Sequence, residues 1–122
     1  MIVGHGVDIL EKDRFSNLFN KYPSKIIDKY FLFDEINIKD VRCISNNFSA
    51  KEAFSKALGL GFRYPSYPNS IIIKRDKLGK PLISLRPELK KYMIEKYSNY
   101  AIHLSISDTK LLSISSVIIE QI

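Results

Sequence analysis

Two carboxylates and one lysine are the residues of this chain whose surroundings suggest chemistry. Asp8 lies between Val7 and Ile9 in an apolar, strand-like segment, where aspartate is unfavourable and a buried carboxylate needs a partner or a metal ion. Glu52 and Lys56 are four residues apart, so they share one face of a helix. Placed above a phosphate, that pair can hold a metal ion through the carboxylate and neutralise a leaving oxygen through the ammonium.

The same residues also have simple structural explanations. Asp8 can be an acid at the end of a strand that faces water or pairs with Arg14. Glu52 and Lys56 can form an exposed ion pair worth about 0.2–0.5 kcal/mol. Type and spacing alone favour these explanations, so a catalytic role needs further support.

The segment His103–Lys110 supplies a third group of polar residues. His103, Ser105 and Ser107 alternate along a strand, so they line a polar surface or pocket on one face. A lone strand histidine is more often structural than catalytic, and no second histidine lies nearby to form a chelating pair. His5 is an odd number of residues from Asp8, so the two side chains should lie on opposite faces of their strand.

The pattern of apolar residues predicts the elements that position these side chains. The expected helices cover Phe15–Tyr22, a short stretch from Ser24 to Phe31, a brief turn from Asp34, a central helix from Val41 or Ser45 to Leu58 that stops at Gly59, and Glu88–Tyr97. The expected strands are 2–10, a hairpin over 71–85, and a closing hairpin formed by 101–107 and 111–119, with a surface loop over 61–69. Gly4 and Gly6 interrupt the first strand, which indicates that another backbone approaches it closely.

Composition limits the class of protein. A chain of 122 residues with 45% hydrophobic content suits one domain, expected to span residues 1–122. Cys43 is the only cysteine, which excludes an internal disulfide, and neither a membrane helix nor a signal peptide is expected, so the cytoplasm is the default location. The net charge of +6 attracts anions. It leaves open an alternative, a small basic α+β domain that binds nucleic acid without catalysis.

Taken in order, four segments resemble the holo-acyl-carrier-protein synthase family, a group of phosphopantetheinyl transferases. They are GHGVDILEKDR at 4–14, FSAKEAFSKALGLG at 48–61, IIIKRDKLGKP at 71–81 and HLSISDTK at 103–110. The resemblance spans nearly the whole chain. It raises the catalytic interpretation of Asp8 and Glu52 above the structural one.

The resemblance implies an α+β fold in which a small antiparallel sheet packs against a central helix. It also implies a homotrimer with active sites at subunit interfaces, where Asp8 would come from one subunit and Glu52 with Lys56 from its neighbour. Asp8 and Glu52 would ligate Mg²⁺, which accepts one or two carboxylates together with substrate phosphates.

The implied reaction transfers 4′-phosphopantetheine from coenzyme A to a serine of apo acyl carrier protein and releases adenosine 3′,5′-bisphosphate, in support of fatty acid biosynthesis. Lys56 would stabilise the departing oxygen, and either Glu52 or a metal-bound water would accept the serine proton. The remaining residues implied by resemblance are the coenzyme-binding Ser55, Gly59, Lys80, Pro81 and His103, and Arg14, which would meet the acidic carrier protein.

The chain departs from the family pattern at two positions. Asn47 stands where the family often has an arginine, and Asp108 stands where it often has a second histidine. The first departure weakens the expectation of a phosphate clamp at position 47. At position 108, an aspartate could instead hold water or a cation.

Overall fold

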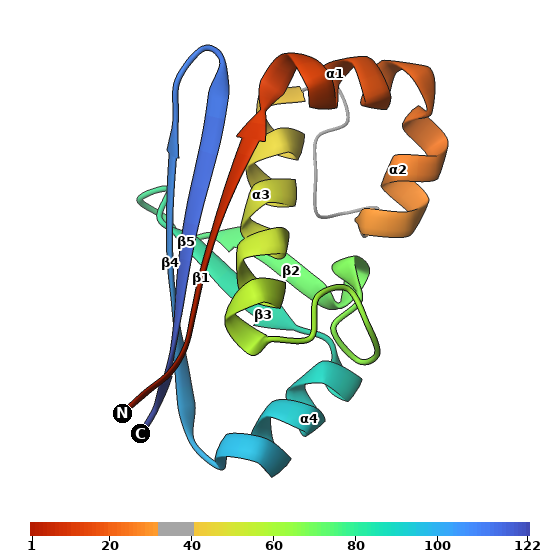
Figure 1. The fold of residues 1–122 in the computed structure, drawn as a ribbon. Helices are drawn as coiled ribbons and strands as arrows, with labels where there is room; N and C mark the ends of the chain where they lie inside the picture. Colours follow the sequence, from red (N-terminus) through yellow and green to blue (C-terminus); the bar gives the residue numbers. More distant parts are fainter. Residues whose placement is uncertain (32–40) are drawn as a thin grey trace.

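The central helix α3 (Val41–Leu58) packs along strand β1 (Ile2–Glu11), and this contact organises the fold (Figure 1). The structure is a computed structural model that describes residues 1–31 and 41–122. Helix α3 begins at the earlier of the two predicted starts and ends before Gly59, whose φ of +83° is the left-handed conformation typical of a helix C-terminus.

Two glycines allow β1 to approach α3 this closely. A Cβ atom on Gly6 would lie 2.0 Å from the carbonyl oxygen of Ala53, and one on Gly4 would lie 2.2 Å from that of Ala57. Real side chains do not tolerate such distances, so only glycine fits at either position. The predicted close backbone approach at Gly4 and Gly6 is confirmed, and the approaching element is the central helix.

Strand β1 belongs to a three-stranded antiparallel sheet. The central strand is β5 (Leu112–Gln121), which separates β1 from β4 (Tyr100–Asp108). Asp8 pairs with Ser115 of β5, and Ser115 pairs in turn with Ile106 of β4. One face of the sheet meets α3, and no described helix covers the other face (Figure 1).

A two-stranded antiparallel hairpin, formed by β2 (Ile71–Arg75) and β3 (Pro81–Leu85), continues beside β4. The short 3-10 helix η1 (Pro68–Ser70) leads into it, and α4 (Pro87–Tyr97) follows it. The hairpin and α4 match the prediction from sequence, whereas η1 was not predicted. Helix α4 extends one residue further toward the N-terminus than expected, because proline suits the first turn of a helix.

Helices α1 (Lys12–Lys21) and α2 (Pro23–Tyr30) extend from the end of β1 (Figure 1). Pro23 ends α1 as predicted, but it also begins α2. The sequence suggested that Ser24 caps α2, and this prediction is wrong. The N-cap is Tyr22, without a side-chain cap bond. The turn expected from Asp34 lies outside the described residues.

The buried residues form two clusters. The larger cluster joins α3, the sheets and α4 through side chains such as Phe54, Leu89 and Ile119. The smaller cluster joins α1, α2 and the start of α3, with Phe15 and Ile44 among its members. The fold is therefore α+β, with a small antiparallel sheet packed against a central helix, as predicted. Within the two described ranges, no helix is both long enough and apolar enough to cross a membrane.

Candidate active site

Asp8 and Lys56 meet where β1 crosses the last turns of α3. The Lys56 Nζ donates to Oδ1 of Asp8 at 3.0 Å and to the carbonyl oxygen of Val7 at 3.1 Å. The Asp8 side chain is only 12% exposed, whereas that of Lys56 is half exposed. The even-numbered position of Asp8 turns it toward α3, and its predicted separation from His5 across the strand is confirmed. The Asp8 carboxylate is therefore nearly buried, and its hydrogen-bond partner Lys56 is half exposed.

Glu52 lies one helical turn before Lys56 and completes this group. Burial raises the pKa of Glu52 above its ordinary value, and the negative charge of Asp8 raises it further, while Lys56 partly offsets both effects. The negative charge of Asp8 beside Glu52 favours an additional cation at this group. In the part of the chain that the structure describes, no group of three or more His, Cys, Asp or Glu side chains forms a metal-ligand set. Asp8 and Glu52 together place two carboxylates beside Lys56.

The origin of this group differs from the expectation. The sequence interpretation took Asp8 from one subunit and Glu52 with Lys56 from a neighbour, and that is wrong. Asp8 contacts Lys56 and influences Glu52 within a single chain. The reason is the close approach of β1 to α3, which brings residues 48 positions apart in the sequence into hydrogen-bonding contact.

Ser55 and Gly59 lie near this group but differ in access. Ser55 is fully buried, and its hydroxyl donates to the carbonyl oxygen of Glu52 at 2.8 Å within the same helix. Gly59 is exposed at the end of α3, where its N–H donates to the carbonyl oxygens of Ser55 and Lys56. Gly59 is thus open to solvent at the end of the helix that carries Lys56, whereas the Ser55 hydroxyl is hydrogen-bonded within the helix.

Lys80 ends the turn of the β2–β3 hairpin, and Pro81 begins β3 directly after it. Asp76 closes the tip, because its Oδ1 accepts from the N–H groups of Leu78 and Lys80. Pro81 lines a cleft of about 420 Å³ together with residues from α3 and β4. Asp8, Glu52 and Lys56 do not line this cleft, so within one chain Pro81 lies apart from the Asp8–Lys56 group.

Comparison with known proteins shows which family combines these features. The family model of the 4′-phosphopantetheinyl transferase superfamily matches residues 4–107. The chain belongs to this superfamily. A holo-[acyl-carrier-protein] synthase of Clostridium acetobutylicum is 42% identical over 98% of both chains. One from Clostridium botulinum is 40% identical over the full length of both.

Solved structures of the superfamily share the fold. The crystal structure of the holo-[acyl-carrier-protein] synthase of Neisseria meningitidis has a TM-score of 0.91 at 32% identity and covers 98% of this chain and 99% of its own. That of Helicobacter pylori in complex with coenzyme A has a TM-score of 0.83 at 28% identity, with coverage of 95% and 99%. The resemblance read from the four sequence segments is confirmed.

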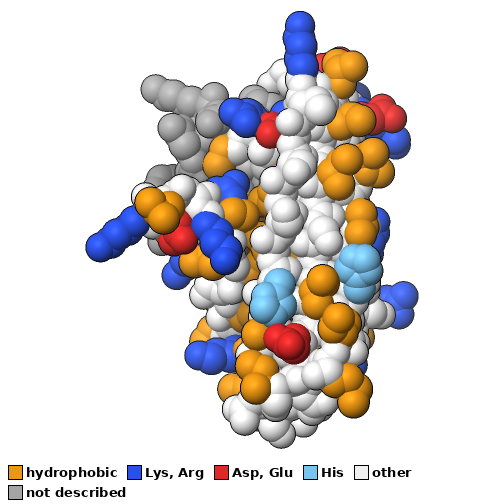
Figure 2. All heavy atoms as spheres, turned by 90° about the vertical axis from the view of Figure 1, so that its left-hand side faces the viewer, with side chains coloured by type: hydrophobic (Ala, Val, Ile, Leu, Met, Phe, Trp, Pro, Cys, Tyr) orange, Lys and Arg blue, Asp and Glu red, His pale blue; other side chains and the backbone are white. Residues whose placement is uncertain are grey.

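His103 lies apart from the other predicted site residues of this superfamily member. It projects from the face of the sheet opposite α3, where its Nε2 is 3.1 Å from Oε1 of Glu120. Figure 2 shows this face, with both histidines of the chain among apolar side chains. The strand alternation of His103, Ser105 and Ser107 is confirmed, and all three are exposed. Within one chain, the structure does not bring His103 to the Asp8–Lys56 group.

Arg14 is exposed on α1 beside an apolar cavity. The cavity has a volume of about 550 Å³, and its walls include Leu10, Phe15, Leu18 and Phe48 as well as Arg14. Leu10 follows Asp8 on the same face of β1, and Phe48 lies one turn before Glu52 on α3. The cavity therefore adjoins the carboxylate pair and carries a cation at its rim.

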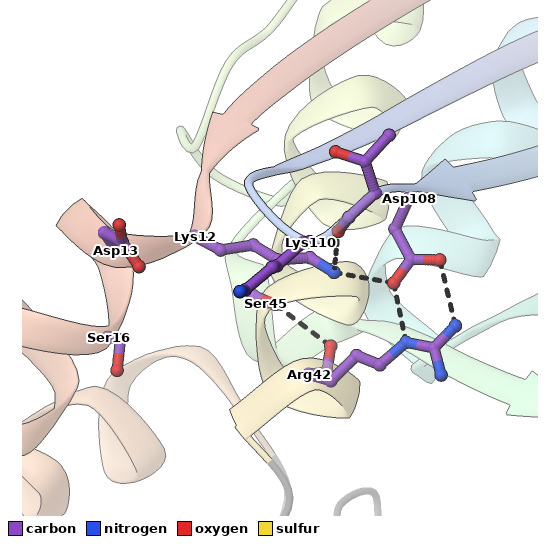
Figure 3. A pocket seen from close by; sticks show the side chains of 8 residues that line it. Lys12, Asp13, Ser16, Arg42, Ser45, Asp108 and Lys110 are labelled. Carbon is purple, nitrogen blue, oxygen red and sulfur yellow. Dashed lines mark hydrogen bonds and ion pairs between the residues drawn. The ribbon is translucent and has the colours of Figure 1, made fainter.

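An ion cluster around Asp108 was missed by sequence reasoning. Lys12 donates to Oδ2 of Asp108 at 2.6 Å, and Arg42 donates to Oδ2 through Nε at 2.6 Å and to Oδ1 through Nη2 at 3.0 Å (Figure 3). Arg42 is the largest cause of a pKa for Asp108 well below the usual range, followed by Lys12, with a smaller hydrogen-bond contribution from Asn46. The three charged residues are far apart in the sequence, so no local spacing could have indicated the cluster.

Proposed function

We propose that this chain transfers 4′-phosphopantetheine from coenzyme A to a serine of an apo acyl carrier protein, releasing adenosine 3′,5′-bisphosphate. The observation that carries the proposal is the Asp8–Glu52–Lys56 group within a member of the transferase superfamily. Relatives at 40–42% identity are named holo-[acyl-carrier-protein] synthase, and the Helicobacter pylori structure contains coenzyme A. The same findings favour a transferase over a nucleic-acid-binding domain. We place the reaction in the cytoplasm, in support of fatty acid biosynthesis.

Mg²⁺ fits the carboxylate pair. Mg²⁺ is commonly bound by one or two carboxylates together with substrate phosphates, and Asp8 and Glu52 supply two such ligands. The raised pKa of Glu52 reflects a local excess of negative charge and burial that a divalent cation would relieve. When bound, the ion would neutralise the diphosphate charge that develops during transfer.

The protein groups have separate roles in this reaction. Lys56 would turn its ammonium from Asp8 toward the oxygen that leaves with adenosine 3′,5′-bisphosphate, a small movement for a half-exposed side chain. Glu52, which lies one helical turn before Lys56, would accept the serine proton. Phosphoryl transfer needs positioning and charge neutralisation rather than a covalent intermediate on the protein, and this group supplies both.

We further propose that three chains assemble with the active sites between them. The uncovered face of the sheet carries Val7, Ile9 and Ile114, all at least 40% exposed, which suits burial against other copies of the chain. Within one chain the predicted coenzyme-binding residues lie in separate places, which also supports active sites that are built from two chains. One chain would contribute Asp8, Glu52 and Lys56, and its neighbour Lys80 and Pro81.

The carrier protein would approach over α1. Arg14 lines the apolar cavity near the carboxylate pair. A helix of an acidic partner would meet the positive charge of Arg14 and the apolar walls of the cavity there. The net charge of +6 favours the same encounter. This arrangement would bring the carrier serine to Glu52.

Mass spectrometry of the carrier protein tests the proposed function. The chain is incubated with an apo acyl carrier protein, coenzyme A and Mg²⁺, and a mass gain of one phosphopantetheine is expected on the carrier. Replacement of the carrier serine by alanine is the control and should prevent the gain. An unmodified carrier after prolonged incubation with folded enzyme would refute the proposal.

A further inference from the structure

The interface between α3 and the sheet changes from apolar to polar along the helix. Near the end of α3, the backbone of Ala53 and Ala57 lies against the two glycines of β1. Toward the start of α3, the side chains at this interface are small and polar, and none is more than 7% exposed. They are Asn46 and Ser49 of α3 and Ser113 and Ser115 of β5. Polar side chains this deeply buried are costly unless each has a hydrogen-bond partner.

Ser49 and Ser115 lie near each other because both are neighbours of Asp8. The Ser49 hydroxyl donates to the backbone carbonyl oxygen of Asp8 at 3.5 Å, and Asp8 pairs with Ser115 across the sheet. Paired residues of antiparallel strands share a face and have Cβ atoms about 4.5–5.5 Å apart. The Ser115 side chain therefore lies beside that of Asp8 on the face that meets α3.

Asn46 and Ser113 are related in the same way through Asp108. Asn46 makes a side-chain hydrogen bond to the Asp108 carboxylate, and Asp108 pairs with Ser113 across the sheet. Asn46 precedes Ser49 by one helical turn, and Ser113 precedes Ser115 by two strand residues, steps of about 4.5 Å and about 7 Å. The four polar side chains thus form one continuous buried layer.

Three of these side chains carry a buried polar atom for which the described residues provide no hydrogen-bond partner. The atoms are Oδ1 of Asn46 and the hydroxyl oxygens of Ser113 and Ser115. The amide oxygen can only accept, whereas each hydroxyl can both donate and accept. A buried water molecule makes about two to four hydrogen bonds of both kinds, so water can satisfy all three side chains.

We propose that ordered internal water occupies this layer and forms hydrogen bonds with Asn46, Ser113 and Ser115. The water would connect the first turns of α3 to the central strand of the sheet, between Asp8 and Asp108. All three atoms are buried, so a ligand that reaches them must be as small as water. The water site is therefore additional to the coenzyme and carrier-protein sites of the proposed function.

The sign of a change in Tm separates a hydrated layer from a dry one. Ser113→Ala and Ser115→Ala each remove hydrogen bonds to the water, and each is expected to lower the Tm by about 3–6 °C. In a dry layer the same changes would remove an unsatisfied polar group and raise the Tm. Because the two serines share the water, the double variant should lose less than the sum of the single losses. Ser84→Ala, at a partly exposed serine of β3, is the matched control and should leave the Tm nearly unchanged.

A high-resolution crystal structure locates the water directly. Density for water within hydrogen-bonding distance of at least two of the three atoms is expected in the wild type, and the double variant should lose it. Hydroxyls that donate directly to protein carbonyl oxygens, with no water between them, would overturn the inference. A higher Tm in either serine variant would also overturn it. Neither measurement involves the transfer of phosphopantetheine, so the water site and the proposed function can fail independently.

Discussion

The Lys56 ammonium lies 3.0 Å from the Asp8 carboxylate and so joins the end of the central helix to the first strand. The lysine is half exposed and the aspartate is nearly buried, so only the lysine can turn outward to a ligand. This contact places a mobile positive charge against a fixed negative one, at the point where a diphosphate would approach. The first two predictions follow from it.

Replacement of Lys56 should impair catalysis more than folding. Lys56→Met is expected to lower kcat about 100-fold, because the leaving oxygen loses its charge partner, and Lys56→Arg should retain part of the rate. Steady-state kinetics with apo carrier protein measures both. Lys91→Met, at an exposed lysine of α4, is the control and should behave like the wild type. A fully active Lys56→Met enzyme would remove the lysine from the mechanism.

Mixed assemblies should reveal that Asp8 and Lys56 act within one chain. Because both residues belong to the same chain's group, trimers that combine Asp8→Asn with Lys56→Met subunits should stay inactive. Trimers that combine wild-type and Asp8→Asn subunits should instead show activity in proportion to the wild-type chains. Differently tagged subunits, co-expressed and purified through both tags, provide the material. Recovery of activity in the first mixture would mean that sites take these residues from two chains.

The uncovered sheet face should determine assembly. Ile9 is 63% exposed on this face, and Ile9→Lys would place a charge where we expect apolar contact between copies. Sedimentation should show the wild type as a trimer and Ile9→Lys as a monomer with little activity. Ile94→Lys is the control, because Ile94 is a half-exposed apolar residue of α4, outside this face, and it should remain trimeric. A trimeric Ile9→Lys protein would place the interface elsewhere.

The sequence predicted the elements well because their signals are local. Apolar periodicity gave the helices, and Pro23 and Gly59 gave their ends. The cap of α2 was missed because Pro23 could both end one helix and begin the next, with Tyr22 between them.

The site was predicted less completely because its geometry is not local. Glu52 and Lys56 were placed together by helical spacing, but the position of Asp8 in the same chain depends on how closely β1 approaches α3. Gly4 and Gly6 predicted that another backbone approaches β1 closely, but they did not identify the approaching element. The contacts of Asp108 with Lys12 and Arg42 span 96 and 66 residues, and no pattern in the sequence connects them.

Gly6 should be indispensable for the fold. Gly6→Ala would place a methyl group 2.0 Å from the carbonyl oxygen of Ala53 and 2.5 Å from the backbone nitrogen of Ala57, so β1 must move away from α3. The expected loss in the free energy of unfolding is about 3 kcal/mol or more. Urea denaturation measures it. Gly59→Asn is the comparison and should cost about 1 kcal/mol or less, since nothing lies within 4 Å and asparagine tolerates positive φ. Similar stabilities for the two variants would contradict the close packing of β1.

The ion cluster around Asp108 should make stability depend on pH in the acid range. The pKa of Asp108 is lowered in the folded state by Arg42 and Lys12, so its stabilising effect is complete above the unfolded pKa of about 3.9. That effect declines as the pH falls below this value, because protonation removes the charge that both cations contact. Asp108→Asn should therefore reduce the free energy of unfolding by about 1–3 kcal/mol at pH 6, and by progressively less between pH 4 and pH 2. Urea denaturation across this range measures the difference. Glu95→Gln, at an exposed acid 3.9 Å from Lys91, should change stability by about 0.5 kcal/mol or less throughout. A difference for Asp108→Asn that stays constant down to pH 2 would show that the carboxylate's charge contributes nothing to the cluster.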